Sequence, residues 1–597
     1  MKDAGQKNKQ IEEQSEFLIG ARSMLVIQVG EFFTHALLFD SVENQYRLLG
    51  QAVAPTTANA PTQNVLTGIR DCIKRLEFVI GRTLLEEHGE LINPTAPDGS
   101  GVEGVAATVS AGPPLKIVTA GLLEDVSVSS AQNLARATYC GEMVTISLNS
   151  IQDQASQIDA ILRLGPDIVI VAGGTDQGAV QSVFSVFETV HMACQLMRDT
   201  ERPAVLFAGN QELNDEIEKR FGATLDIQFS PNVRPALDVE KLAGAQEKIG
   251  AITKQIRVNQ INGLKELDGW ADGGLLPTAA AFGNVIQFLS SARSKAKGVM
   301  GIDIASSATT LATAYNGNLS LRVFPELGLC SDLNPLLEPE SLGGVTQWLS
   351  MDIPVEDVKT YLLNKSLYPT NIPLTVEDLA IEHALARHLI RSAMKQNRGA
   401  LPPGIPSNGE KHLPWVEPIL ASGDVLARTP SLAHALLILL DGLQPTGATT
   451  FVLDPYGTAA ALGATARDNP TLTVQVLDSN AFVHLGTVIS LVGDAKPGTP
   501  ILRAELIDEA DYEIRVEIRS GSIDWLPLAP GKTAMLKLHP LQKFDVGMGG
   551  PGIGGTLLVK GGAMGVVIDG RGRPLKLPSE AEERYETFHK WLWALRD

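Results

Sequence analysis

The sequence has few cysteines and no long hydrophobic run. Cys72, Cys140, Cys194 and Cys330 are the four cysteines among 597 residues, and no two of them form a CxxC pair. This spacing favours buried thiols in a reducing compartment over disulfides or zinc sites. No apolar run approaches the roughly 18 residues that a membrane helix needs. The N-terminal stretch is polar and lacks the apolar core of a signal peptide. These absences predict a soluble, cytoplasmic protein without a membrane span.

Basic residues are also in deficit. The chain has 49 Lys and Arg against 68 Asp and Glu, which gives a formal net charge of −19. This charge excludes a nucleic-acid phosphate backbone as the expected partner. The ten histidines form no HExxH motif or paired ligand spacing, so no metal site is predicted from them. With 44% hydrophobic and 20% charged residues, the composition is that of a globular protein with an ample core.

The order of apolar runs and turns predicts five segments. Strand–turn–helix units between about 147 and 245, such as "DIVIVAGGTDQGAV", are typical of a parallel sheet. Past residue 481 the chain changes to short strands separated by turns, which indicates a small all-β domain. Helices are predicted over 65–91 and 376–396 from the three- and four-residue spacing of apolar residues. The expected segments are a polar tail (1–16), a first lobe with an α/β insert (17–297), a second lobe (298–480), an all-β domain (481–577) and a C-terminal helix (578–597).

Two strand–turn–strand elements resemble each other. Residues 27–36, "IQVGEFFTHA", and 302–311, "IDIASSATTL", each pass from an apolar strand through a turn and have Thr in the eighth place. In such a hairpin, backbone N–H groups and hydroxyls can approach phosphate oxygens. An acid at the strand end, such as Asp303, is compatible with phosphate if it holds the hydration shell of Mg²⁺ or orients a water. The repeat predicts two similar lobes with a nucleotide between them.

Several longer segments resemble a known family. The segments are "DIASSATT", "PDIVIVAGGTDQG", "VLFAGNQELNDEI", "NVRPAL", "VLARTPSLAHALLILLDGLQPTGATTFVLDPYG", "LGA" and, near the C-terminus, "MGVVIDGRGRPLKLP". They are similar to the glutamate-mutase-associated MutL family, which is unrelated to mismatch-repair MutL. The resemblance covers roughly residues 24–480. It implies an α/β fold of the two-lobed, actin-like ATPase class (a duplicated ribonuclease-H-like fold). It also implies a reactivating chaperone of adenosylcobalamin-dependent mutases.

The resemblance assigns the nucleotide site residue by residue. It implies Asp303 as the catalytic carboxylate, which would position the attacking water and hold Mg²⁺ through water if ATP binds. It implies nucleotide contacts from eight residues: Gly30, Thr34, Ser306, Ser307, Thr309, Thr310, Gly423 and Asp424. ATP or ADP with Mg²⁺ is therefore the expected cofactor. The DxHxxG motif of base-off cobalamin binding is absent, so the chain is not expected to be the mutase itself.

Several of the family's positions are changed in this chain. The first loop has Gln28 where the family has Asp and His35 where it has Lys, and Glu31 adds a negative charge near the expected phosphate. Such a charge at ~4 Å costs several kcal/mol at an effective dielectric near 20. In the second loop, Ala305 and Ser306 replace glycines, and Asp424 replaces a glycine in the adenosine segment. These changes predict a degenerate ATPase.

Two further turns carry candidate groups. Gly173, Gly174, Thr175 and Asp176 follow a strand and precede a helix, so they form a candidate anion-binding turn. The alternative is a tight turn in which Asp176 caps the helix. The turn "DGRGRP" (569–574) is expected to expose two arginines to solvent, or to an acidic partner surface.

The leading hypothesis is an accessory or chaperone-like actin-fold protein with weak or absent ATPase activity. Its partner would be a cobalamin-dependent mutase or another cytosolic protein. Two alternatives stay open: an active ATP-hydrolysing reactivase, favoured by Asp303, and a non-catalytic protein-interaction scaffold. Gln28, Glu31 and Asp424 favour either the leading hypothesis or the scaffold.

Overall fold

The computed structural model has a mixed α/β fold with four sheets. The polar tail expected over residues 1–16 lies outside the described residues. The chain forms two compact units, each assembled from three separate segments. The structure describes residues 22–176, 178–292, 296–407, 409 and 412–595. Unit 1 contains the described residues of 22–112, 254–282 and 458–482, and unit 2 those of 113–253, 283–457 and 483–595.

Unit 1 is built on a five-stranded sheet in the order β10-β4-β1-β2-β3. The strands β1, β2 and β3 form an antiparallel meander, whereas β4 runs parallel to β1 and β10 runs parallel to β4. Their bounds are Met24–Val29 (β1), Phe33–Val42 (β2), Gln45–Pro55 (β3), Gly104–Val109 (β4) and Leu275–Pro277 (β10).

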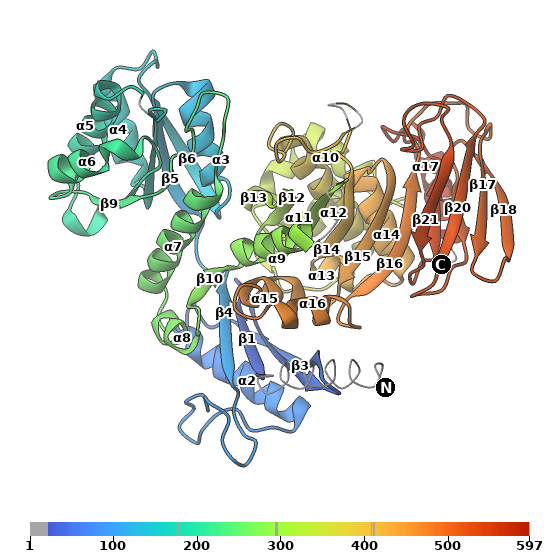
Figure 1. Ribbon diagram of the computed structural model, residues 1–597, viewed down its shortest axis with the longest axis horizontal. Helices are drawn as coiled ribbons and strands as arrows, with labels where there is room; N and C mark the ends of the chain where they lie inside the picture. Colours follow the sequence, from blue (N-terminus) through green and yellow to red (C-terminus); the bar gives the residue numbers. More distant parts are fainter. Residues whose placement is uncertain (1–21, 177, 293–295, 408, 410–411, 596–597) are drawn as a thin grey trace, which may run out of the picture. The chain divides into compact units, whose positions relative to one another are not determined.

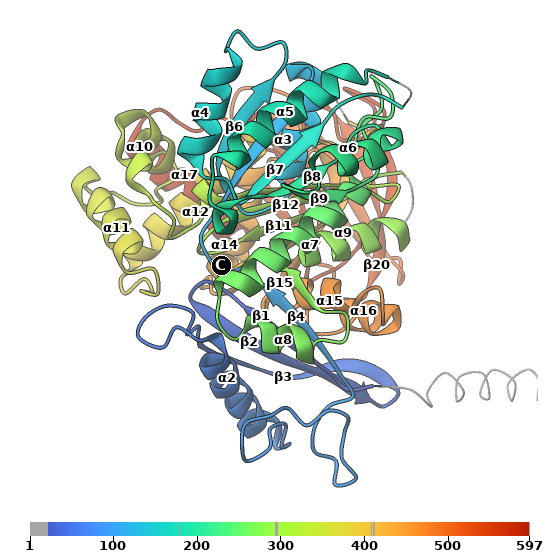
Figure 2. The same ribbon diagram turned by 90° about the vertical axis from the view of Figure 1, so that its left-hand side faces the viewer.

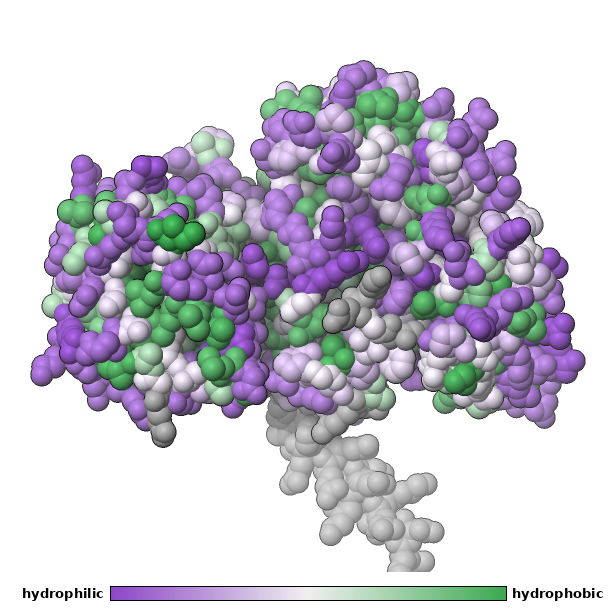
Figure 3. All heavy atoms as spheres, turned by 90° about the horizontal axis from the view of Figure 1, so that it is seen from above, coloured by the Kyte–Doolittle hydropathy of each residue, from purple (hydrophilic) through white to green (hydrophobic). Residues whose placement is uncertain are grey.

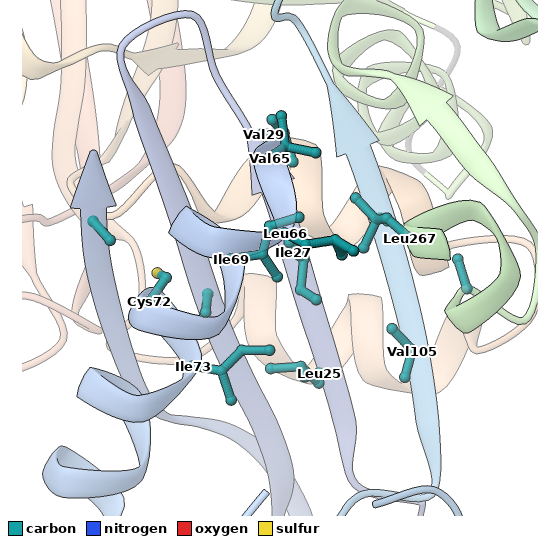
Figure 4. Close-up of a cluster of buried hydrophobic side chains, with 14 of the residues drawn as sticks. Leu25, Ile27, Val29, Val65, Leu66, Ile69, Cys72, Ile73, Val105 and Leu267 are labelled. Carbon is teal, nitrogen blue, oxygen red and sulfur yellow. The ribbon is translucent and has the colours of Figure 1, made fainter. Parts of the chain in front are cut away.

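Helix α2 (Val65–Ile80) covers one face of this sheet (Figures 1 and 2). Asn64 caps its N-terminus by accepting a hydrogen bond from the Leu66 N–H. Its buried face meets apolar side chains of β1 and β4, as Figure 4 shows for Ile69, Ile73 and Leu25. Gly81 ends the helix in the left-handed conformation, with φ of 68°. The helix predicted to run to residue 91 is therefore shorter than expected.

Two short helices after residue 457 pack on the sheet of unit 1. They are α15 (Thr458–Thr465) and α16 (Pro470–Leu477), and α15 is buried along most of its length. The Tyr46 N–H donates to Gln475 Oε1 (2.7 Å), and Asn469 Nδ2 donates to the Tyr46 hydroxyl (3.1 Å). The segment expected to belong to the second lobe thus packs against β3 and β4 of unit 1. Helix α8 (Leu264–Trp270) adds Leu264 and Leu267 to the apolar core that the sheet forms with α2, and α7 spans Ala243–Gln260.

The largest sheet of unit 2 has eight strands in the order β13-β12-β11-β14-β15-β16-β22-β19. Its first five strands repeat the order and directions of the unit 1 sheet. This duplication confirms the expected actin-like fold class. The strand bounds are Gly298–Ile304 (β11), Thr309–Tyr315 (β12), Asn318–Phe324 (β13), Val416–Ser422 (β14), Gly447–Asp454 (β15), Val483–Ser490 (β16), Ile523–Leu526 (β19) and Val566–Asp569 (β22).

Helices α12 and α14 pack together within unit 2. Helix α12 (Val376–Gln396) has the bounds predicted from the sequence, and Thr375 begins it with a capping box to Asp378. The bounds of α14 are Leu432–Leu443, and further helices are α10 (Pro339–Thr346), α11 (Val355–Leu367), α13 (Asp424–Ala427) and α9 (Thr278–Ala292), whose first residues belong to unit 1. No helix in the described part of the chain is long and apolar enough to cross a membrane.

The α/β insert forms an all-parallel sheet in the order β6-β5-β7-β8-β9. It begins at β5, so it extends further toward the N-terminus than the expected start near residue 147. Its strands are Leu115–Gly121 (β5), Cys140–Ser147 (β6), Ile168–Ala172 (β7), Ala204–Phe207 (β8) and Asp226–Phe229 (β9). Its helices are Ser129–Ala135 (α3), Gln154–Leu164 (α4), Gln181–Gln195 (α5) and Asn214–Phe221 (α6).

The strands after residue 481 divide between two sheets. The strands β16, β19 and β22 extend the large sheet of unit 2, whereas four others form a separate antiparallel sheet. An all-β domain over 481–577 is therefore not separated from the second lobe, because one sheet spans the expected boundary. The antiparallel sheet contains Pro500–Asp508 (β17), Glu513–Arg519 (β18), Thr533–Pro540 (β20) and Gly555–Lys560 (β21).

The turn at 569–574 is buried, contrary to the expectation of exposed arginines. Only 1% of each of the Arg571 and Arg573 side chains is accessible, and both pair with Asp569. Arg571 Nη1 also bonds Asp441 Oδ1 of α14 (2.6 Å), whose other oxygen accepts from Arg387 Nε of α12 (2.7 Å). This buried ion network therefore joins the C-terminal segment to two helices of the second lobe.

The C-terminal helix α17 (Ala581–Ala594) packs over this network. Trp591 lies over the Arg571 guanidinium at 4.5 Å and donates its indole N–H to the Gly521 carbonyl. Elsewhere, on the face shown in Figure 3, hydrophilic residues surround scattered hydrophobic ones.

Candidate functional site

The first candidate loop connects β1 to β2 and is closed by its own hydrogen bonds. The Gly30 N–H donates to the Phe33 carbonyl (3.0 Å), which a Cβ on Gly30 would approach to 2.6 Å. The Gly30 carbonyl accepts from the Thr56 hydroxyl (2.9 Å), and the Thr34 hydroxyl shares a hydrogen bond with that same hydroxyl. The buried Thr34 hydroxyl and the Gly30 N–H, both expected to contact phosphate, are thus engaged within the loop.

Glu31 of the first loop has partners in unit 1. Its Oε2 accepts a hydrogen bond from the Gly112 N–H (2.9 Å), and Arg257 is close enough to stabilise its charge. Burial raises the pKa of Glu31, while the Gly112 N–H and Arg257 oppose that rise. The Glu31 carboxyl therefore already has a backbone N–H donor and a nearby arginine within unit 1. In the β1–β2 ladder, Gln28 lies opposite His35.

The second candidate loop connects β11 to β12 and has the same register. Asp303 lies opposite Thr310, as Gln28 lies opposite His35, and Ile304 lies opposite Thr309 as Val29 lies opposite Thr34. The alignment of the two hairpins, which the sequence predicted, is therefore confirmed by strand pairing.

A segment after β13 covers the backbone of this second loop. The Leu329 and Cys330 N–H groups donate to the carbonyls of Ala305 (3.1 Å) and Ser306 (2.8 Å). A Cβ on Gly328 would lie 2.5 Å from the Ser306 carbonyl oxygen, so only glycine allows this approach. The Ala305 N–H closes the turn on the Ala308 carbonyl.

Two further polar groups at the second loop, one in a side chain and one in the backbone, have partners within unit 2. The Thr309 hydroxyl donates to the Leu327 carbonyl (2.6 Å), and the Ser307 carbonyl accepts from the Tyr139 hydroxyl (3.4 Å). Thr310 is buried, with 6% of its surface accessible. The expected phosphate contacts at these positions stay predictions.

Asp303 lies at the carboxyl end of β11 beside two residues that sequence reasoning did not single out. In the parallel ladder it pairs with Ser422 of β14, which pairs in turn with Asp454 of β15. Burial raises the pKa of Asp303 to about 6; a hydrogen bond from Ser422 opposes the rise, and the carboxylates of Asp454 and Asp424 add to it. The sequence signal for Asp454 was present, because "VLDPYG" places an acid at the end of a buried strand.

The adenosine segment places Gly423 and Asp424 directly after β14. Gly423 has φ of 120°, and a Cβ there would meet the Ile304 carbonyl oxygen at 2.3 Å, so this position requires glycine. Asp424 begins the short helix α13 and pairs with Arg428 (3.2 Å), with about two thirds of each side chain exposed. The structure therefore places Asp303, Gly423 and Asp424 at the carboxyl ends of two adjacent parallel strands of the large sheet, β11 and β14.

The candidate anion-binding turn is held by contacts within the insert. Asn232 Nδ2 donates to the Gly174 carbonyl (3.0 Å) and to Asp176 Oδ1 (2.9 Å). Helix α5 begins after Val180 without a side-chain cap, so Asp176 does not cap it. Gly173 and Thr175 complete this turn, and their role toward an anion stays a prediction.

Within the described ranges, no group of three or more His, Cys, Asp or Glu side chains has an arrangement suited to a metal ion. The role of Asp303 in holding Mg²⁺ through water therefore stays a prediction. All four cysteines are free, and Cys72, Cys194 and Cys330 are buried.

The chain matches one known protein family. A family model described as MutL protein matches residues 24–481. The chain belongs to this family. The expected resemblance is thus confirmed over the two duplicated sheets and the insert. A search of curated proteins found no match.

Several solved structures are similar to this MutL-family chain. Nucleotide-free acetone carboxylase, from work on ATP-dependent acetone carboxylation, is 10% identical, with 84% of this chain and 81% of that chain covered and a TM-score of 0.31. Component A of (R)-2-hydroxyglutaryl-CoA dehydratase from Acidaminococcus fermentans is 8% identical (74% and 95% covered, TM-score 0.27). Nucleotide-free diol dehydratase-reactivating factor is 10% identical (75% and 100% covered, TM-score 0.27).

Proposed function

We propose that this MutL-family protein is an accessory, chaperone-like partner of an adenosylcobalamin-dependent mutase, with weak or absent ATP hydrolysis. Family membership supports the accessory role. The internal closure of both candidate loops supports the weak nucleotide chemistry, and it is the observation on which the proposal depends.

The two loops are closed in corresponding ways. In each, the segment that follows the third strand of the meander donates hydrogen bonds to the loop: Thr56 in unit 1, and Leu329 with Cys330 in unit 2. Phosphate oxygens need N–H and hydroxyl donors. The Gly30 and Ala305 N–H groups and the Thr309 hydroxyl already donate within the chain, so each must lose a partner before it binds phosphate. Glu31 adds repulsion in the first loop. Together these features favour weak Mg-ATP binding.

A second candidate function is an ATP-hydrolysing reactivase, and Asp303 favours it. A carboxyl whose pKa is about 6 is well suited to accept a proton near neutral pH. In that case Asp303 would orient a water and accept its proton. The two functions differ in whether the chain turns ATP over.

Calorimetric titration with Mg-ATP and Mg-ADP, followed by ATP turnover with and without a purified adenosylcobalamin-dependent mutase, separates the two functions. We expect weak binding and negligible turnover of the full chain, and a complex with the mutase that forms without nucleotide. Turnover that the mutase stimulates and that Asp303→Ala abolishes would establish the reactivase instead. Failure to bind any such mutase would refute the accessory role.

A restoration variant tests the nucleotide site independently of the partner. Reinstating the family's residues should tighten Mg-ATP binding at least tenfold, which needs only ~1.4 kcal/mol. Asp494→Asn, which removes an exposed acid far along the chain from both loops, is the control and should change nothing. A folded variant without Mg-dependent ATP binding would refute the inferred nucleotide site. The changes are Gln28→Asp, Glu31→Ser, His35→Lys, Ala305→Gly, Ser306→Gly and Asp424→Gly.

A further inference from the structure

A pocket of about 680 Å³ lies between helices α12 and α17 of unit 2. This volume is typical of small-molecule sites. One face of α12 provides its wall, because Val376, Leu379, His383 and Arg387 follow one another at helical spacing. The start of α14 contributes His434, and α17 contributes its last two turns. None of these residues belongs to the two candidate loops or to the adenosine segment.

Apart from Ser350, the polar side chains of the pocket are histidines, one arginine and one lysine. Lining side chains include His383, Arg387, His434, His589 and Lys590, and within the described residues no acidic side chain lines the pocket. This is unexpected in a chain whose net charge is −19. A basic lining in an acidic protein favours an anionic ligand.

His383 has a buried nitrogen that requires a partner. Only 6% of the residue is exposed, and its Nε2 has no hydrogen-bond partner among the described residues. Buried polar atoms are almost always hydrogen-bonded, so an orphan atom at a pocket wall indicates a missing ligand group. Burial, Arg387 and His434 lower the pKa of His383 to about 3, so the ring is neutral. Its N–H can then donate to an anion.

Arg387 connects the pocket to the buried ion network. That network places three guanidinium groups (Arg387, Arg571 and Arg573) against two carboxylates (Asp441 and Asp569), so it carries an excess positive charge. A buried charge without a counter-charge is costly. Of the three arginines, only Arg387 lines the pocket, and an anion there would supply the missing negative charge.

Apart from Ser350, the rest of the lining is apolar. Phe588, Leu379 and Leu592 line the pocket, and at its rim Val376 and Trp593 are 65% and 81% exposed. Phe588 also lies 5.5 Å from the Arg387 guanidinium, so the apolar wall adjoins the cationic base. A ligand that covered this wall would gain about 25 cal/mol for each Å² of apolar surface buried.

We propose that this pocket binds a small amphipathic anion, a carboxylate with an apolar chain. The carboxylate lies at Arg387 and His383, and the chain contacts Leu379, Phe588 and Trp593. The proposal goes beyond the proposed function and does not depend on nucleotide binding or on the mutase partner.

Titration of the full chain with octanoate, 1-octanol and octyltrimethylammonium tests the proposal, because the three share one apolar chain and differ in charge. We expect octanoate to bind with one-to-one stoichiometry and at least about tenfold more tightly than the cation, a difference of ~1.4 kcal/mol. Octanoate that fails to saturate at millimolar concentration, or a cation that binds equally well, would overturn the proposal.

Two variants locate the site. Leu379→Trp fills the pocket from a partly exposed position and should weaken octanoate about tenfold or more, since a bulky ring removes the space for the chain. His383→Phe should lower the preference for octanoate over 1-octanol about fivefold, as expected for the loss of one hydrogen bond. Unchanged octanoate affinity in Leu379→Trp would refute this location.

A matched pair of lysines controls for charge. Lys590 at the rim pairs with Glu586, and Lys576, outside the pocket lining, pairs with Asp494; in each pair the side chains are about 70% exposed. Lys590→Glu should weaken octanoate about threefold and leave 1-octanol unchanged, because a rim charge acts mainly through Coulomb attraction. Lys576→Glu should leave both affinities unchanged. Equal effects of the two variants would show that net charge alone attracts the anion, and would overturn the proposal.

Discussion

Replacement of Asp303 by Asn should stabilise the protein at neutral pH. Burial raises the pKa of this carboxyl from 3.8 to about 6, and Asp454 and Asp424 add to the rise. Between these two pKa values the folded chain holds a proton that the unfolded chain has lost, so stability falls as the pH rises from about 4 to about 6. Above pH 6 the folded protein carries the full penalty of the buried charge.

The size of the effect follows from the shift. About two pH units correspond to about 3 kcal/mol. Part of the Asp303 side chain reaches solvent, which screens its charge, so we expect Asp303→Asn to gain about 1 to 3 kcal/mol at pH 8. The gain should shrink as the pH falls to 4, where the wild-type carboxyl is protonated in both states.

Urea unfolding of wild type and Asp303→Asn at pH 4, 5, 6, 7 and 8, followed by tryptophan fluorescence, measures this difference. Asp494→Asn serves as the control, because 74% of the Asp494 side chain is exposed. Its effect should stay small at every pH. A stability difference between Asp303→Asn and wild type that does not change between pH 4 and pH 8 would refute the assignment of a raised pKa to Asp303.

Three further predictions concern the fold. Gly423→Ala should destabilise the protein by about 2 kcal/mol or more in urea unfolding, because its Cβ would meet the Ile304 carbonyl; Gly399→Ala, at positive φ with open space around it, should cost only about 1 kcal/mol. Arg571→Met should cost about 3 to 5 kcal/mol because it removes the hydrogen bonds that Arg571 donates to two buried carboxylates, whereas Lys576→Met should cost under about 0.5 kcal/mol; equal urea midpoints for the two variants would contradict this. The pKa of each of the four cysteine thiols is raised to about 11 or 12, chiefly by burial, so a disulfide reagent at pH 8 should label them about 100-fold more slowly than a free thiol until urea unfolds the chain; rapid labelling of the native protein would disprove it.

The sequence determined the local features that depend on neighbouring residues. The strand starts, the turn residues and the Thr in the eighth place of 27–36 and 302–311 predicted two similar hairpins, and the strand pairing gives both the same register. The apolar spacing of 376–396 predicted helix α12 with its observed bounds. These predictions succeeded because backbone conformation and hydrophobic periodicity are encoded within about twenty consecutive residues.

Only the tertiary structure decided features that join distant segments. Arg571 appeared to be an exposed turn residue, yet it pairs with Asp441, 130 positions earlier in the chain. Strand pairing likewise brings Ser422 and Asp454, which are distant in the sequence, beside Asp303. Helices α15 and α16 belong to unit 1 although they follow the strands of the second lobe in the sequence. A turn that contains arginines has the same local sequence whether water solvates the guanidinium groups or buried carboxylates pair with them. The choice between the two depends on which partner the rest of the fold brings within hydrogen-bond distance, and the local sequence does not contain that information.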